Sequence, residues 1–108
     1  MMNRNCQLLH AAVLISALSA PAWASPDLAD KSACLNCHQV DKKIVGPSFV
    51  SIAAKYKDRK DIVAYLTEKI VKGSSGAWGT IPMPANAQIK ADDANALSTW
   101  IMTLTEKK

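Results

Sequence analysis

Apolar residues recur at helical spacing in four segments of the chain, and no segment alternates apolar and polar residues as a half-buried strand does. The first three expected helices span residues 26 to about 40, 47 to about 56, and 58 or 61 to 73. The last begins near Asp92, and its apolar stripe recurs at i, i+3, i+4 and i+7: Leu97, Trp100, Ile101 and Leu104. The pattern therefore predicts an all-α fold class with about four helices.

The segment between the third and the last helix has no helical or strand period. Residues 73–91 contain three glycines and two prolines, which interrupt regular structure. A segment of this length without secondary structure is usually functional when it is ordered. We therefore expect a long ordered loop here.

The first 24 residues differ in composition from the rest of the chain. They carry one charged residue, Arg4, and an apolar run over residues 8–20, followed by small residues up to Ala24. This layout predicts a secretory signal peptide that is cleaved after Ala24. A run of this length is shorter than the roughly 20 residues that span a bilayer, so an uncleaved anchor would need the run to continue through Pro21. Cys6 precedes the run, which does not support a lipoprotein cleavage site.

Composition and charge narrow the function classes. The chain has 108 residues, of which 49% are hydrophobic and 20% charged, and its net charge is +4, which is typical of one small soluble domain. The basic residues are scattered along an exported chain, so they do not indicate nucleic-acid binding. Residues 25–108 form a single domain whose small core would benefit from a disulfide, a metal or a cofactor.

The pentapeptide CLNCH at residues 34–38 indicates that cofactor. In the C-x-x-C-H signature of c-type haem, Cys34 and Cys37 add to the two vinyl groups and His38 supplies an axial nitrogen to the iron. A zinc site would need a fourth ligand, and residues 25–108 contain no other cysteine or histidine. A Cys34–Cys37 disulfide or a redox-active thiol pair remains the alternative to haem.

The sixth ligand of a bound haem is sought among two methionines. His10 leaves with the signal peptide, so a second histidine is not available from residues 25–108. Met102 falls about 140° from Leu97 on the last helix, off the apolar stripe. Met83 lies between two prolines, which stiffen the loop around it. Met83 is the expected iron ligand, and a vacant or lysine-ligated iron is the alternative.

These motifs together resemble a bacterial class I c-type cytochrome of the short cytochrome c-551/c-552 type. The matching residues cover nearly all of 25–108: residues 34–38, 45–47, 73–79 and 81–84, with Asn86, Leu97 and Trp100. The resemblance implies a small cytochrome c fold around one covalently attached haem c. It also implies that the Pro47 carbonyl accepts from the His38 ring, that Trp78 donates to a haem propionate, and that Asn86 donates toward the Met83 sulfur.

Lys69 departs from the family pattern, because many relatives have arginine at this place. It falls inside the apolar stripe of the third helix, next to Leu66 and Ile70. Its ammonium either reaches solvent while the stem packs, or pairs with a haem propionate. As a point charge, lysine should bind a carboxylate less strongly than the arginine fork.

A His/Met-ligated haem without an open coordination position predicts a periplasmic electron carrier and no enzyme activity. The expected partners are redox proteins that dock transiently, such as membrane cytochromes and a terminal reductase, peroxidase or oxidase, and the carrier itself is expected to be a monomer. The alternatives are a haem-based ligand sensor or peroxidase-like protein with a labile sixth ligand, and a haem-free thiol-disulfide protein.

The same residues suggest a core and a docking surface. Leu97 and Trp100 should pack on the first helix near Leu28 and Leu35. Four large apolar residues should close around the haem: Phe49, Leu66, Ile70 and Trp78. Small apolar residues should form the docking surface: Val45, Gly46, Pro47, Ile81, Pro82, Pro84 and Ala85. Four lysines are expected around it: Lys42, Lys43, Lys72 and Lys90.

Overall fold

The structure of the protein, a computed structural model, describes residues 26–106. It contains four α-helices: α1 (Pro26–Lys31), α2 (Phe49–Tyr56), α3 (Ile62–Lys72) and α4 (Ala91–Thr103). Two short 3-10 turns complete the order of elements, η1 (Cys34–Asn36) after α1 and η2 (Leu104–Glu106) after α4. The described residues form no strand, so the predicted all-α class is confirmed. The expected signal peptide, residues 1–24, lies outside the described residues.

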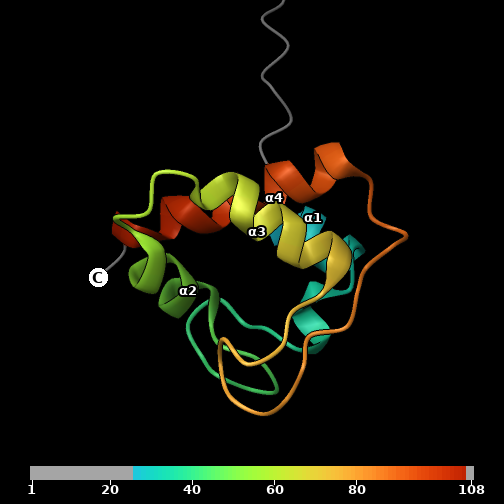
Figure 1. Ribbon diagram of the computed structural model, residues 1–108, viewed down its shortest axis with the longest axis horizontal. Coiled ribbons are helices and arrows are strands. Elements are labelled where there is room, and N and C mark those ends of the chain that lie inside the picture. Colours follow the sequence, from blue (N-terminus) through green and yellow to red (C-terminus); the bar gives the residue numbers. More distant parts are fainter. Residues whose placement is uncertain (1–25, 107–108) are drawn as a thin grey trace, which may run out of the picture.

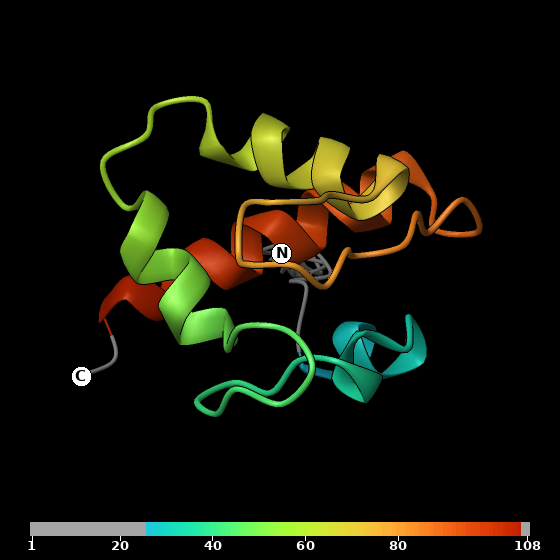
Figure 2. The ribbon, with the colours of Figure 1, turned by 60° about the horizontal axis from the view of Figure 1, so that its bottom comes forward.

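The other helices pack around α4, and the long loops extend to one side of α3 and α4. The most extensive helix contact is between α3 and α4, and α2 packs against α4 and η2. Figure 1 shows α3 crossing α4, with the loops 37–48 and 73–90 both extending below them. Figure 2 shows the second of these loops, in orange, passing in front of α4 and below α3. The predicted ordered loop is therefore present, and it lies beside α3 and α4.

The core is formed by the apolar stripes of the last three helices. Leu97 is 1% exposed, and the same stripe buries Ile101 and Leu104 as predicted. The other buried apolar residues are Ala29, Phe49, Ile52, Ala53, Ile62, Leu66, Ile70, Ile89 and Ala94. Trp100 is half-buried, and its ring meets that of Phe49 edge-on with centroids 5.2 Å apart. The stripe of α4 was thus predicted correctly, although its tryptophan lies at the margin of the core.

The α3–α4 contact also contains a short polar chain. Ser98 is completely buried, and its hydroxyl donates to the Ala94 carbonyl at 2.8 Å. The Thr67 hydroxyl lies 3.1 Å from the Ser98 hydroxyl and donates to the Val63 carbonyl at 2.6 Å. Both hydroxyls have a hydrogen-bond partner. The small side chains of Thr67 and Ser98 therefore let α3 and α4 approach closely without the cost of an unsatisfied hydroxyl.

The first predicted helix is wrong in its length. α1 ends at Lys31, and Ala33 takes the left-handed conformation with φ 60°. A non-glycine residue in that conformation stops the i to i−4 pattern of a helix. The chain then turns into η1, where the Cys37 and His38 amides both donate to the Cys34 carbonyl, at 3.1 and 2.9 Å. The two cysteines therefore lie on a tight turn and not on one face of a long helix.

The start of the second helix was also predicted two residues too early. α2 begins at Phe49, and Ser48 is its N-cap, since the Ser48 hydroxyl accepts from the Ser51 amide at 3.1 Å. Pro47 therefore lies before the helix rather than in its first turn. Its carbonyl consequently takes no part in the hydrogen bonds of α2 and is available to another partner.

Substitution of Leu97 by alanine tests the assignment of the core. Leu97 lies on α4 and is almost fully buried in the core. Leu97→Ala should therefore lower the free energy of unfolding by about 2–5 kcal/mol. Denaturant unfolding of the holoprotein measures the change. Thr99→Ala is the matched control, because Thr99 is exposed on the same helix and should change the free energy by less than about 0.5 kcal/mol. Equal unfolding midpoints for the two variants would contradict the assignment.

Candidate functional site

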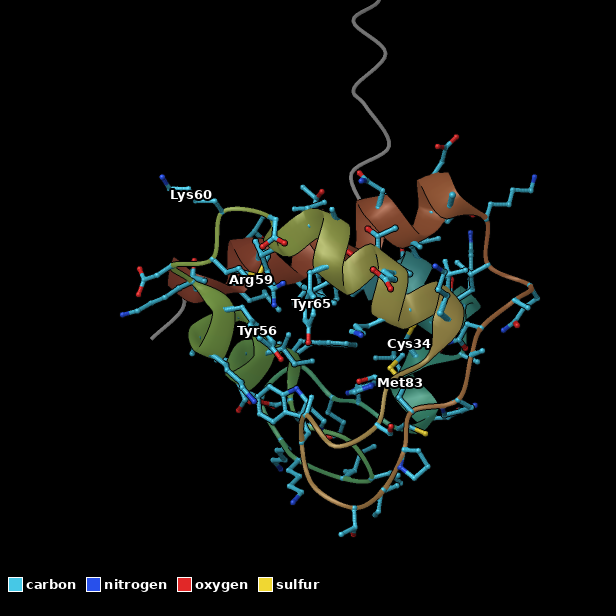
Figure 3. The ribbon with its side chains drawn as sticks, in the orientation of Figure 1. Cys34, Tyr56, Arg59, Lys60, Tyr65 and Met83 are labelled. Atoms are coloured by element: carbon cyan, nitrogen blue, oxygen red, sulfur yellow. The ribbon has the colours of Figure 1, made fainter. Side chains whose placement is uncertain are left out.

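One apolar cavity brings together the eight residues that the sequence marked as haem-binding or iron-ligating. It lies between the helices and the two long loops, and its walls include Phe49, Leu66, Ile70, Leu97 and Ile101. The eight predicted site residues all line it: Cys34, Cys37, His38, Pro47, Lys69, Trp78, Met83 and Asn86. Figure 3 shows Tyr56 and Tyr65 directed toward this space, with Cys34 and Met83 at its other side. Residues more than 50 positions apart in the sequence, such as Cys34 and Asn86, thus meet at one site.

The His38 ring is held in one orientation. Its Nδ1 lies 2.7 Å from the Pro47 carbonyl oxygen. A carbonyl only accepts, so Nδ1 carries the proton and donates, which leaves the lone pair of the neutral ring on Nε2. Phe49 stacks on the ring with centroids 5.3 Å apart and an interplanar angle of 24°. The ring therefore offers Nε2 as a metal ligand in a fixed direction.

Gly46 allows the loop to pass directly against His38. A Cβ atom at position 46 would lie 2.5 Å from Cε1 and 2.9 Å from Nδ1 of the His38 ring. The Gly46 amide donates to the Cys37 carbonyl at 2.7 Å, which fixes the loop to the turn that carries the cysteines. The glycine and the proline of residues 45–47 therefore act together, one by leaving room and the other by accepting from the ring.

The two cysteines are free and half-buried. Burial raises the pKa of the Cys34 thiol above its ordinary value; the nearby Cys37 raises it further, and a backbone hydrogen bond partly opposes this. The thiols are not joined in this structure, so they remain available for addition to another group. Their place on the wall of the cavity fits two thioether bonds to one flat ligand.

Met83 is positioned by hydrogen bonds at the base of its loop. The Ser74 amide donates to the Met83 carbonyl at 3.0 Å, and the Met83 amide donates to the Ser74 carbonyl at 2.8 Å. Gly73, with φ 83°, precedes this pair, and a Cβ there would lie 2.7 Å from the Met83 carbonyl oxygen. Met102 was predicted to point off the buried face of the last helix, but it is half-buried against the core. It does not line the cavity.

Asn86 differs from what the resemblance implied. Its side-chain amide donates to the Ile70 carbonyl at 3.0 Å and to the Pro84 carbonyl at 3.4 Å, rather than to the Met83 sulfur. Its backbone amide also donates to the Ile70 carbonyl, at 3.2 Å. The physical reason is that the last carbonyls of α3 have no partner within the helix. In this structure Asn86 fastens the loop to the end of α3.

Lys69 and Trp78 lie at the cavity as expected. Lys69 is half-buried, and its Nζ lies 5.1 Å from the centre of the Tyr65 ring. Trp78 is 39% exposed and lines the cavity near the surface. The apolar stem of the lysine and the indole ring therefore close the cavity on the side of α2 and α3.

Two tyrosines that the sequence analysis did not assign also line the cavity. The Tyr56 ring lies 5.4 Å from the Tyr65 ring and 6.3 Å from the Trp78 ring, centroid to centroid. Burial and the adjacent Tyr65 hydroxyl raise the pKa of Tyr56. Tyr65 lies on the same face of α3 as Ile62 and Leu66, and Tyr56 follows Ile52 by four residues, so helical spacing could have identified both.

The comparisons with known proteins show the family to which the chain belongs. The family model for cytochrome c matches residues 25–105 of the chain. The chain belongs to the cytochrome c family. This cytochrome is 54% identical over 83 residues to cytochrome c-552 of Nitrosomonas europaea, and the aligned region covers 77% of this chain and 81% of that protein. It is 50% identical over 78 residues to cytochrome c-551 of Pseudomonas denitrificans, and the aligned region covers 72% of this chain and 94% of that protein.

A solved structure shows the same fold. The crystal structure of wild-type Nitrosomonas europaea cytochrome c552 matches with a TM-score of 0.74 and 53% sequence identity, and it covers 75% of this chain and 100% of that chain. The cytochrome is therefore of the short c-551/c-552 type and carries one covalently attached haem c with its iron. Its relatives are electron carriers, so it is an electron-transfer protein rather than an enzyme. Among residues 26–106, no helix is long and apolar enough to cross a membrane.

Gly46→Ala tests the close approach of the loop to His38. The added methyl group should displace the His38 ring or the loop, which changes the haem absorption spectrum and destabilises the protein by about 1–3 kcal/mol. Visible spectroscopy and denaturant unfolding of the holoprotein measure both effects. Gly76→Ala is the control, because a Cβ at position 76 meets nothing within 4 Å and only the cost of its positive φ remains. An unchanged haem spectrum in Gly46→Ala would show that the approach is not tight.

Proposed function

We propose that the protein is a periplasmic monohaem electron carrier in which Cys34 and Cys37 hold the haem and His38 and Met83 are the axial iron ligands. The observation that carries the proposal is that both thiols, the His38 ring and the Met83 side chain line the same apolar cavity. When bound, the haem supplies one-electron chemistry through its iron. The residues of the chain bind it, orient its ligands and exclude water.

The Pro47 carbonyl sets the donor strength of His38. It accepts from Nδ1 at 2.7 Å, so it fixes the ring tautomer and makes Nε2 a stronger donor to a metal. Phe49 stacks on the ring, which limits rotation. This side of the cavity is therefore preorganised for one axial ligand.

Met83 favours electron transfer over ligand binding. A thioether ligand raises the reduction potential relative to a second histidine. The Ser74–Met83 hydrogen bonds and Gly73 hold the loop that presents it. With Met83 as the sixth ligand, no position would remain for oxygen or peroxide, and this is what distinguishes the proposed carrier from the alternative of a ligand sensor or peroxidase-like protein.

The proposed docking surface lies around the cavity. Val45 and Ile81 line the cavity and are 50% and 64% exposed, and Trp78 and Ile44 are exposed beside them. Pro47, Pro82 and Pro84 line it as well, whereas Ala85 does not. The expected surrounding lysines are exposed: Lys42, Lys43, Lys72 and Lys90. A small apolar surface of this kind suits short-lived complexes with redox donors and acceptors, such as membrane cytochromes and a terminal reductase, peroxidase or oxidase.

Export completes the proposed function. Residues 1–24 have the composition of a signal peptide, and residues 25–108 form the single cytochrome c domain that remains after cleavage. An exported protein meets its redox partners in the periplasm, where we place this monomeric carrier.

Met83→Ala tests the axial ligand directly. Loss of the thioether should open the iron to azide or imidazole and lower the reduction potential, because the ligand that favours ferrous iron is gone. Ligand titration by visible spectroscopy and potentiometry measure the two effects. Met102→Ala is the matched control, since Met102 does not line the cavity and its loss should change neither. Ligand binding in Met102→Ala but not in Met83→Ala would overturn the proposal.

Lys69→Met tests whether this lysine compensates a haem propionate. Removal of the positive charge leaves the propionate uncompensated, which favours ferric iron and should lower the reduction potential. Lys69→Arg should keep or raise the potential, because a guanidinium binds a carboxylate in bidentate fashion. Lys72→Met removes the same charge from the exposed side of the end of α3 and is the control. If Lys69→Met and Lys72→Met change the reduction potential equally, Lys69 does not pair with a propionate.

A further inference from the structure

The tip of the long loop, residues 75–82, has little that holds it in place. Its base is fixed by the Ser74–Met83 hydrogen bonds. Gly76 and Gly79 both have positive φ, and a Cβ atom at either position would meet nothing within 4 Å. In the described part of the chain, one hydrogen bond links the tip to the rest of the protein: the Lys55 ammonium donates to the Ala77 carbonyl at 2.9 Å.

Lys55 makes a second contact with the tip. Its Nζ lies 4.3 Å from the centre of the Trp78 ring, within the range of a cation–π interaction. Tyr56, the next residue of α2, meets the Trp78 ring edge-on, with centroids 6.3 Å apart. One side chain in the last turn of α2 therefore contacts two consecutive residues of the tip, a carbonyl in one and a ring in the other.

We propose that Lys55 is a positioning residue that holds Trp78 and the loop tip over the mouth of the cavity. Trp78 lines the cavity, so its place limits how much water reaches the bound haem. The same loop continues to Met83, so a loose tip also weakens the support of that residue. The inference rests on the proposed function only in taking the cavity as the haem site.

Both contacts are electrostatic, and both lie at the surface. Each exposed interaction is modest, but together they act on a tip that has no other hydrogen bond among the described residues. Salt screens exposed charges. The hold of Lys55 on the tip should therefore weaken as the salt concentration rises.

The test is NMR of the reduced, haem-loaded protein with Lys55→Met. The order parameters of the Trp78 backbone and indole N–H groups should fall from the rigid value of about 0.85 toward 0.6 or below. The Met83 amide, which is hydrogen-bonded to Ser74, should exchange with solvent roughly fivefold faster as the loop opens more often. The reduction potential should fall, because more water reaches the haem.

Two variants separate this role from a general loss of charge. Lys55→Arg keeps both contacts and should restore the order parameters, the exchange rate and the potential. Lys60→Met removes the same charge from an exposed lysine that Figure 3 shows directed away from the cavity, and it should leave the tip rigid. Unchanged order parameters in Lys55→Met, a failure of arginine to restore them, or an equal effect of Lys60→Met would each overturn the inference.

A double-mutant cycle tests whether Lys55 acts through Trp78. In a Trp78→Leu background, Lys55→Met should accelerate exchange of the Met83 amide less than it does in the wild type, because one of the two contacts is already lost. Additive effects would contradict the coupling. The order parameters and amide exchange report on the loop whichever residue ligates the iron, so they can be interpreted even if His38 and Met83 are not the ligands.

Discussion

The hydrogen bond between His38 and the Pro47 carbonyl is the constraint on which the rest of the site depends. It selects the ring tautomer, leaves Nε2 free on a ring that lines the cavity, and joins the cysteine turn to the loop before α2. Several local features accompany it. Ala33 has a left-handed conformation where the chain leaves α1 and turns, and Gly46 has no side chain, so the loop can pass beside the ring. Ser48 starts α2 only after Pro47, which leaves the proline carbonyl free.

A second part of the cavity wall is built on the end of α3. Asn86 fastens the loop to the Ile70 carbonyl, and the Ser74–Met83 hydrogen bonds fix the methionine. The helices α3 and α4 contribute apolar lining residues to the same cavity: Leu66, Ile70, Leu97 and Ile101. The helices therefore supply an apolar wall, while the loops supply the chemistry. Such a division is common where a rigid scaffold carries functional loops.

Sequence reasoning identified the core and the site better than the local backbone. The stripe of Leu97 and Ile101 was readable because burial follows helical periodicity, and CLNCH was readable because its chemistry requires a fixed spacing. The end of α1 could not be predicted from the sequence, because alanine favours helices and nothing in its neighbourhood signals the left-handed conformation of Ala33. The hydrogen bonds of Asn86 and the contacts of Lys55 were missed because both link segments that are far apart in the sequence.

We propose that Met83, and not Met102, is the methionine that ligates the iron. Carbon-13 labelling of the methionine methyl groups, followed by proton–carbon NMR of the reduced holoprotein, tests it most directly. The methyl group of a methionine whose sulfur ligates the haem iron would lie over the haem ring, whose ring current would shift the methyl proton resonance strongly upfield. The account predicts that the Met83 methyl is shifted in this way, while that of Met102 stays at an ordinary position. An upfield resonance assigned to Met102, or ordinary positions for both methyl groups, would contradict it.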